Sequence, residues 1–136
     1  ISDINSIESG IIYGLGIGLF WGEGNKVNRT SLRIGNTDSD LIKTYVIFLR
    51  EFCKVDENRI RFGLQLFNDS NPDKAMNYWL KKLNVPRSKF MNKISSIPTQ
   101  GKGNYKKKNQ YGVVTVYVNN IKLVDWMHSQ IEKFRN

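Results

Sequence analysis

Glu23 is the acidic residue whose surroundings most strongly suggest chemistry. It stands near the end of GLGIGLFWGEG, residues 14–24, in which glycines alternate with large apolar side chains. The spacing predicts a helix, and a carboxylate at a helix C-terminus meets the unfavourable end of the helix dipole. Gly24 suits a left-handed cap just after it. A cation near Glu23 would offset this charge, so Glu23 is a candidate metal ligand.

The glycines of this stretch predict a close contact between helices. Gly14, Gly18 and Gly22 stand four residues apart and therefore share one helical face, which leaves a bare groove. The partner is either another helix of the same chain or a second copy across a two-fold axis. In the second case two Glu23 carboxylates approach each other and need a cation or a proton. Mg²⁺, with Mn²⁺ as a substitute, suits such oxygen ligands, with the Gly22 carbonyl as a second ligand, and would lie beside a phosphodiester.

Other phosphate-binding and nuclease motifs do not fit the sequence. The dinucleotide pattern G-x-G-x-x-G fails because Leu19 or Trp21 occupies the sixth position, and no P-loop pattern occurs. His128 and Cys53 are the only residues of their types, which is too few for a zinc or HNH site. A PD-(D/E)xK site starting at Asp73 has no acid to use, since the next acidic residue is Asp125.

The net charge of +9 is concentrated in one part of the chain. Residues 1–73 hold eight Lys and Arg against ten Asp and Glu, whereas residues 74–124 hold eleven Lys and Arg and no acid. Such a segment is either a solvated basic face or the footprint of a polyanion. Charge alone does not separate DNA from RNA or from an anionic membrane.

Three apolar stripes at helical spacing predict helices that face a core. One follows Thr37–Asp40, which resembles a capping box, and a second follows Asn71-Pro72, an N-cap with proline at the first helical position. The third lies near the C-terminus. Their apolar members are Leu41, Tyr45, Phe48, Leu49 and Phe52; Met76, Trp79, Leu80 and Leu83; and Leu123, Val124, Met127, Ile131 and Phe134.

Alternation with period two predicts antiparallel strands over residues 29–35, 59–67 and 113–119, and a weaker strand over 89–97. The inward positions are Thr30, Leu32 and Ile34; Ile60, Phe62, Leu64 and Leu66; and Val114, Val116 and Val118. The outward positions and a basic loop over 98–110 carry groups that contact phosphates and base edges. The candidate DNA-binding residues are Lys26, Arg29, Ser31, Arg33, Arg59, Arg61, Gln65, Lys93, Lys102, Lys106, Lys107, Lys108, Thr115 and Tyr117.

Residues 16–24, GIGLFWGEG, resemble the nine-residue motif of the LAGLIDADG homing endonucleases. Gly18, Leu19 and Gly24 match the motif directly. Glu23 falls on the acidic position that the family uses as its metal-binding catalytic residue, and Gly22 on the small residue at the helix interface. The WGEG variant is similar to bacterial and archaeal LAGLIDADG-like proteins, in which a helix-turn-helix often precedes the motif and a strand such as YGVVTVYV is followed by a closing helix.

The resemblance implies an α+β fold of the αββαββα type, with an antiparallel saddle-shaped sheet in the DNA major groove and helices on its other face. One motif in the chain implies a homodimer, and the activity implied is Mg²⁺-dependent cleavage of double-stranded DNA. The interval Gly24–Asn36 is short for two strands, and the helix at 72–83 is extra to a minimal unit. Trp21 replaces the first Asp of the motif, which is not the usual metal ligand. Some relatives are maturases or regulators, so a DNA- or RNA-binding module without cleavage and a non-catalytic dimerising domain remain alternatives.

The length of 136 residues predicts one domain over residues 1–136. The chain begins at Ile1, from which we expect an upstream domain outside it. The longest apolar run, over residues 11–21, is too short to span a bilayer, so we expect no membrane partner. A single cysteine fits a reducing compartment, and we expect an intracellular location in the cytoplasm, in the nucleoid or in an organelle.

Overall fold

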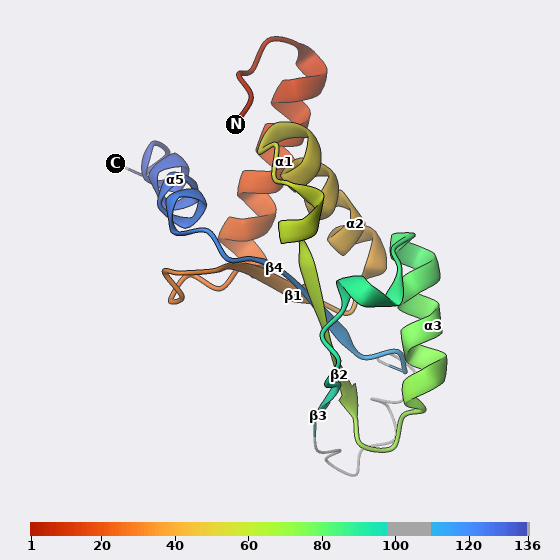
Figure 1. Ribbon diagram of the computed structural model, residues 1–136. Helices are drawn as coiled ribbons and strands as arrows, with labels where there is room; N and C mark the ends of the chain where they lie inside the picture. The colour runs from red at the N-terminus through yellow and green to blue at the C-terminus, as the bar shows by residue number, and fades with distance from the viewer. Residues whose placement is uncertain (98–109, 136) are drawn as a thin grey trace.

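In the computed structural model, residues 1–97 and 110–135 are described (Figure 1). Helices and strands follow one another as α1 (Ile7–Glu23), β1 (Leu32–Asn36), α2 (Ser39–Ile47), β2 (Arg61–Phe67), α3 (Pro72–Leu83), β3 (Ser95–Ile97), β4 (Val113–Val118) and α5 (Ile121–Glu132). A π-helical turn, Phe48–Phe52, follows α2, and short 3₁₀ turns lie at Glu57–Arg59 and Arg87–Lys89. The protein therefore belongs to the α+β class, as the sequence predicts.

The four described strands form one mixed sheet in the order β1-β4-β2-β3. β4 pairs antiparallel with both β1 and β2, whereas β3 pairs parallel with β2. The expectation of a purely antiparallel sheet is therefore wrong at this edge. The physical reason is the crossover through α3, which returns the chain to the sheet in the direction of β2. Of the strand expected over 89–97, only Ser95–Ile97 forms a strand, β3. Phe90, earlier in this segment, forms an isolated parallel bridge with Phe62 of β2.

The segment before β1 is a loop instead of a full strand. Gly24 forms a single bridge with Ile34, and Asn25 N–H donates to the Arg33 carbonyl at 2.9 Å. The strand expected from residue 29 begins only at Leu32. Because the loop does not follow the strand period, the alternation expected there is wrong: Ser31 is buried and Thr30 is exposed.

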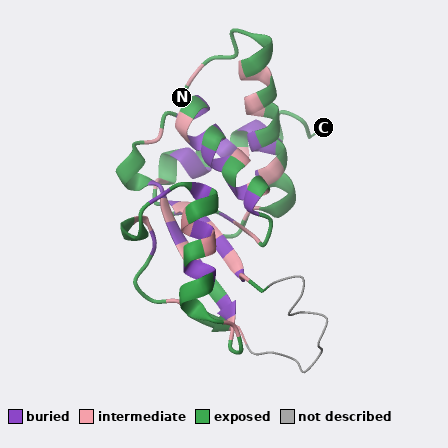
Figure 2. Cartoon of the chain, turned by 90° about the vertical axis from the view of Figure 1, so that its right-hand side faces the viewer, coloured by how far each residue is buried: buried purple, intermediate pink, exposed green. Residues whose placement is uncertain are grey.

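One face of the sheet carries the core. The inward residues of β1, β2 and β4 are buried, and they join the apolar faces of the helices in one cluster (Figure 2). α1, α2 and α5 all contact β1, and α2 also contacts β4. The helices thus cover one face of the sheet, and the opposite face keeps its polar side chains accessible.

The helix ends show how closely local sequence sets the boundaries. Asn71 caps α3 by accepting from Lys74 N–H at 3.1 Å, as predicted. The cap of α2 is Asp38 and not Thr37, because the Asp38 carboxylate accepts from Asp40 N–H at 2.9 Å.

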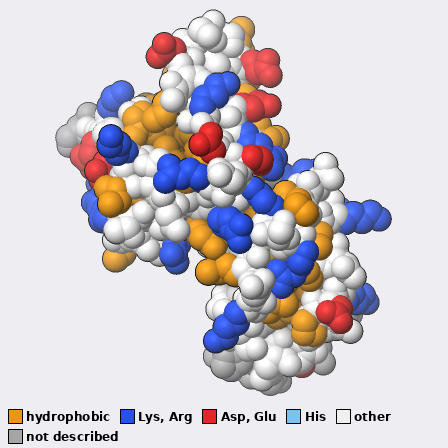
Figure 3. Space-filling view, viewed as in Figure 1, with side chains coloured by type: hydrophobic (Ala, Val, Ile, Leu, Met, Phe, Trp, Pro, Cys, Tyr) orange, Lys and Arg blue, Asp and Glu red, His pale blue; other side chains and the backbone are white. Residues whose placement is uncertain are grey.

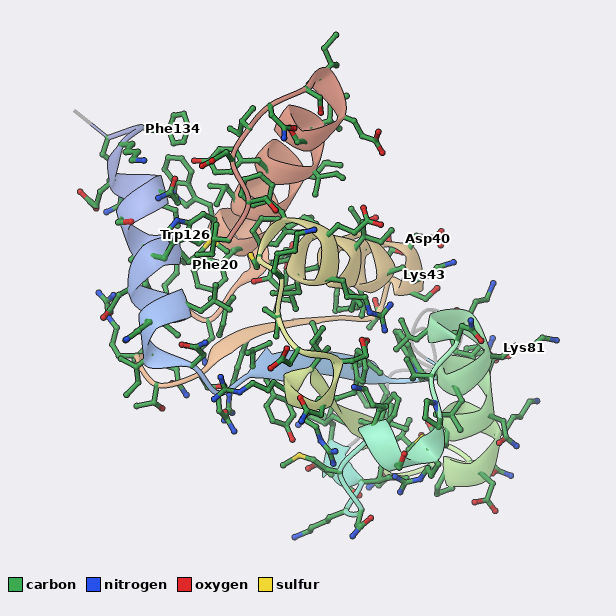
Figure 4. All side chains as sticks on the ribbon, turned by 45° about the horizontal axis from the view of Figure 1, so that its top comes forward. Phe20, Asp40, Lys43, Lys81, Trp126 and Phe134 are labelled. Atoms are coloured by element: carbon green, nitrogen blue, oxygen red, sulfur yellow. The ribbon has the colours of Figure 1, made fainter. Side chains whose placement is uncertain are left out.

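α5 ends before the last residue of its predicted apolar stripe. Because the helix stops at Glu132, Phe134 lies beyond it and is 60% exposed, so its expected place in the core is wrong. Figure 4 shows Phe134 at the end of α5, whereas Trp126 and Phe20 lie between α5 and α1.

Gly16 lies directly against the Phe48 ring of the π-helical turn. A Cβ atom at Gly16 would lie 2.1 Å from Cδ1 of Phe48, so only glycine leaves room for this ring. A Cβ atom at Gly14, Gly18 or Gly22 would meet nothing within 4 Å. An internal helix crossing therefore exists, but it uses Gly16, and the predicted glycine stripe faces away from the protein.

We expect Gly16→Ala to destabilise the protein by about 1–3 kcal/mol, because overpacking forces the Phe48 ring to move. The matched control is Gly18→Ala on the same helix, which removes a flexible residue without a clash and should be neutral or stabilising by up to about 1 kcal/mol. Urea unfolding at a concentration that keeps the chain monomeric measures both. Equal effects of the two variants would contradict the assigned packing of α1.

Candidate nucleic-acid interface

The outer face of the sheet consists of rows that run across β1, β4 and β2. In the first row Arg33 and Arg61 both lie opposite Tyr117 of the central strand. In the next row Gly35 and Gly63 both lie opposite Thr115. A cationic and aromatic row therefore lies beside a row in which Thr115 has the one side chain. Its Oγ1 lies against Gly35, 2.9 Å from where a Cβ atom would be, whereas at Gly63 a Cβ atom would meet only Met91 Sδ, at 3.5 Å, so another molecule can approach the backbone there.

A hollow with a volume of about 250 Å³ lies on this face, and Met91, Lys93 and Ser95 form its wall beyond the glycine row. It is lined by Arg33, Gly63, Leu64, Gln65, Met91, Lys93, Ser95, Thr115 and Tyr117. None of these side chains is acidic, whereas several donate hydrogen bonds. The chemistry of this lining suits an anionic, hydrogen-bonding ligand.

The sheet brings five of the predicted outward residues together here, namely Arg33, Arg61, Gln65, Thr115 and Tyr117, and Lys93 lies in the wall of the hollow. Lys26 and Arg29 lie in the loop before β1 and are exposed. Arg59 is exposed in the 3₁₀ turn that precedes β2, so its expected place in the strand is wrong. Lys102, Lys106, Lys107 and Lys108 lie outside the described residues.

Ser31 is the predicted contact residue that the structure places differently. It is only 2% exposed, so its hydroxyl does not reach the open face of the sheet. Its Oγ instead accepts a hydrogen bond from Arg33 Nε at 3.1 Å. Ser31, expected to contact DNA, therefore supports the side chain of Arg33 instead.

Acidic side chains are unevenly distributed on the surface. In the view of Figure 3, most acidic side chains lie in the upper part, and Lys and Arg side chains continue from the centre downwards. Glu57, the acid of the 3₁₀ turn before β2, is paired, because Arg50 Nε lies 2.5 Å from one of its carboxylate oxygens. The Lys89 ammonium donates to the Glu57 carbonyl.

Glu23 is the last residue of α1, and its side chain is exposed to solvent. Glu23 and Gly22 are exposed, and no hydrogen bond or ion pair of the Glu23 carboxylate is found among the described residues. Gly24 is extended, with φ −75° and ψ 157°, so the expected left-handed cap is wrong. The helix end is capped instead by Lys26, whose Nζ donates to the carbonyls of Trp21 at 2.9 Å and of Gly24 at 3.0 Å. Within the described residues, no three His, Cys, Asp or Glu side chains gather as a metal site.

The outward face of α1 is unusually apolar for a surface helix. Ile7, Ile11, Leu15 and Trp21 are 85%, 57%, 47% and 39% exposed. They share the outer surface of the helix with the three glycines of the stripe, and Trp21 also has the Arg135 guanidinium 5.9 Å from its ring centre. At the three glycines this face is open, because a Cβ atom there would meet nothing within 4 Å.

The single histidine and the single cysteine both pack against the core. His128 is half-buried with its ring edge against Phe20, and its Nε2 has no partner among the described residues. Burial lowers the pKa of His128, and the charges of Arg29, Arg135 and Lys26 lower it further. Burial raises the pKa of the Cys53 thiol to about 12, so this cysteine is not a nucleophile at neutral pH.

Sequence reasoning missed the glycine row as part of the site. Gly35 follows Arg33, and Gly63 follows Arg61, by two residues, so each glycine faces the same side of the sheet as the arginine before it. That repeated Arg-x-Gly spacing in two strands is the signal that could have revealed it.

Comparisons of this chain with models of protein families, with curated proteins and with solved structures found no match. Over residues 1–97 and 110–135, no helix has both the length and the apolar composition needed to cross a membrane.

Proposed function

We propose that the protein binds double-stranded DNA on the outer face of its sheet, as a homodimer joined through α1, and cleaves both strands with Mg²⁺ held at Glu23. The observation that carries this proposal is the row of Arg33, Tyr117 and Arg61 beside the row of Gly35, Thr115 and Gly63 on the outer face of the sheet. The proposed reaction is the one that the LAGLIDADG resemblance implies.

The outer sheet face has the properties that a duplex requires. Guanidinium, amide and hydroxyl groups match the donors and acceptors of base edges, and lysines at the border match phosphates. At Gly63 a Cβ atom would meet only Met91 Sδ, at 3.5 Å, so a duplex can approach β2 closely there, whereas the Thr115 hydroxyl lies over Gly35. The order α1, the Gly24 bridge, β1, α2, β2, β4 and α5 is also compatible with an αββαββα unit into which α3 and β3 are inserted.

The outward face of α1 supports a second copy as the partner. Three glycines with open space above them let two helices approach closely, and the exposed Ile11, Leu15 and Trp21 supply apolar area around them. Gly22 precedes Glu23, so a two-fold axis at the glycines would bring two Glu23 carboxylates together over the paired sheets. Each Glu23 would then serve one strand through a shared or neighbouring Mg²⁺ ion.

One observation favours a second candidate function, DNA or RNA binding without cleavage. The Lys26 ammonium already places a positive charge at the C-terminal carbonyls of α1. If it also neutralises the Glu23 pair in a dimer, the site needs no metal ion. The dimer and the sheet face would then act in binding alone.

The binding surface can be tested with Gly63→Glu. A Cβ atom at Gly63 would meet only Met91 Sδ at 3.5 Å, an ordinary contact, so we expect the fold to tolerate the substitution while a carboxylate enters the hollow. We expect duplex affinity to fall at least on the order of 10-fold, with little change in unfolding free energy. Anisotropy of a labelled duplex measures the affinity.

The control for Gly63→Glu is Asn77→Glu on the exposed face of α3, which adds the same charge away from the sheet. Wild-type affinity should also fall with salt, by about 0.9 log unit per log unit of salt for each phosphate contacted. Equal losses in the two variants, or an affinity that does not depend on salt, would contradict duplex binding at this face.

The dimer can be tested with Gly18→Leu. In a monomer the new side chain enters open space, whereas in the proposed dimer it separates the two helices at a cost of about 1–3 kcal/mol or more. Analytical ultracentrifugation should show dimers for the wild type and for the surface control Asn77→Leu, and monomers for Gly18→Leu. A wild type that stays monomeric with and without a duplex would refute the α1 interface.

Cleavage can be tested with Glu23→Gln, which keeps the shape of the side chain and removes its charge. We expect it to abolish Mg²⁺- or Mn²⁺-dependent cleavage of a duplex selected from a randomised library. Binding in Ca²⁺ should stay within about 2-fold of wild type, because the phosphate contacts lie on the sheet. Cleavage that survives Glu23→Gln would show that the metal lies elsewhere, and tight binding without cleavage by the wild type would favour the second candidate function.

A further inference from the structure

The two arginines of the outer row differ in how they are held. Both lie opposite Tyr117, on β1 and β2 respectively. The Arg33 side chain is fixed at two points, since Nε donates to Ser31 Oγ at 3.1 Å and Cζ lies 5.5 Å from the centre of the Tyr117 ring. No comparable anchor of the Arg61 guanidinium is found among the described residues.

The support of Arg33 is itself fixed by the loop before β1. Ser31 N–H donates to Asn28 Oδ1 at 2.9 Å, and Asn28 N–H donates to Asn25 Oδ1 at 3.0 Å. Asn25 N–H in turn donates to the Arg33 carbonyl at 2.9 Å, so the chain of hydrogen bonds returns to the residue that it supports. This arrangement explains why a serine is buried at 2% exposure at the start of the sheet.

An arginine held through Nε presents its two terminal nitrogens outward. No hydrogen bond of Arg33 Nη1 or Nη2 is found within the described residues, and the side chain lines the hollow. Two parallel N–H donors match the O6 and N7 acceptors of guanine in the major groove. Because Ser31 and Tyr117 already restrict the side chain, less conformational entropy is lost when it binds.

We infer that Arg33 reads a guanine through Nη1 and Nη2, and that Ser31 is a positioning residue that fixes the Arg33 guanidinium for this contact. The inference rests on the proposed binding of duplex DNA. Arg61, without such an anchor, supplies charge to the same row.

The guanine contact is tested by selecting duplexes from a randomised library with the wild-type protein and replacing each guanine in turn by 7-deazaguanine, which lacks the N7 acceptor. We expect one position at which the replacement weakens wild-type binding by on the order of 10-fold or more. Arg33→Lys should lose this discrimination and keep the affinity for unrelated duplexes, since a lysine retains the charge without the planar pair of donors. The matched control Arg61→Lys should keep the discrimination.

The role of Ser31 is tested by Ser31→Ala in two backgrounds. With Arg33 present, we expect the discrimination at that guanine to fall several-fold, while the affinity for unrelated duplexes is kept. In the Arg33→Lys background, Ser31→Ala should have no further effect on discrimination. A residue that only supports the fold would instead weaken binding to all duplexes equally in both backgrounds.

The outcomes separate the inference from the proposed function. A wild type that binds no duplex overturns both. Salt-dependent binding with a guanine preference that survives Arg33→Lys overturns the inference alone. Loss of the preference in both Arg33→Lys and Arg61→Lys would show that the row reads the base as a unit and would overturn the separate role of Arg33.

Discussion

The contact between Gly16 and the Phe48 ring determines how α1 is rotated about its own axis, and much of the molecule depends on that rotation. Only glycine admits the ring, because a Cβ atom would lie 2.1 Å from it. Ile17 and Phe20 then point into the core, at 3% and 0% exposure. The same rotation turns Gly14, Gly18 and Gly22 outward, and it leaves Glu23 exposed at the end of the helix.

The second constraint is that the sheet is covered on one side only. Its buried face packs against α1, α2 and α5, and rings from Tyr13, Phe48, Phe52 and Trp126 join α1, the π-helical turn and α5 around this core. Since stability comes from that face, the other face can carry arginines and glycines with little effect on the core. Those residues give the molecule an accessible cationic surface, on which the proposed function depends.

Sequence patterns predicted the regular parts of this fold and failed where tertiary contacts decide. Alternation in β2 and β4 correctly placed the buried residues, because a sheet with one buried face enforces period two. The cap at Asn71 was correct because it depends on neighbouring residues alone. The parallel pairing of β3 was missed because it depends on the path of the chain through α3, which no local pattern records.

In the candidate site, too, local patterns predicted the regular positions, and tertiary contacts decided the rest. The row of Arg33, Tyr117 and Arg61 could be anticipated from alternation, but the burial of Ser31 depends on a loop whose hydrogen bonds return to β1. The glycine stripe was recognised as a helix contact, yet which glycine faces the core depends on the Phe48 ring. The proposed role of Glu23 depends on its exposed position at the end of α1 and on the resemblance of residues 16–24 to the LAGLIDADG motif.

The central claim is that the outer face of the sheet receives a DNA duplex, and amide NMR during titration of ¹⁵N-labelled protein with a duplex tests it most directly. The account predicts the largest shift changes at Gly35, Gly63, Thr115 and Tyr117. Amides on the exposed face of α3, such as Asn77, should not change. Shift changes confined to the helices, or none at saturating duplex, would contradict the claim.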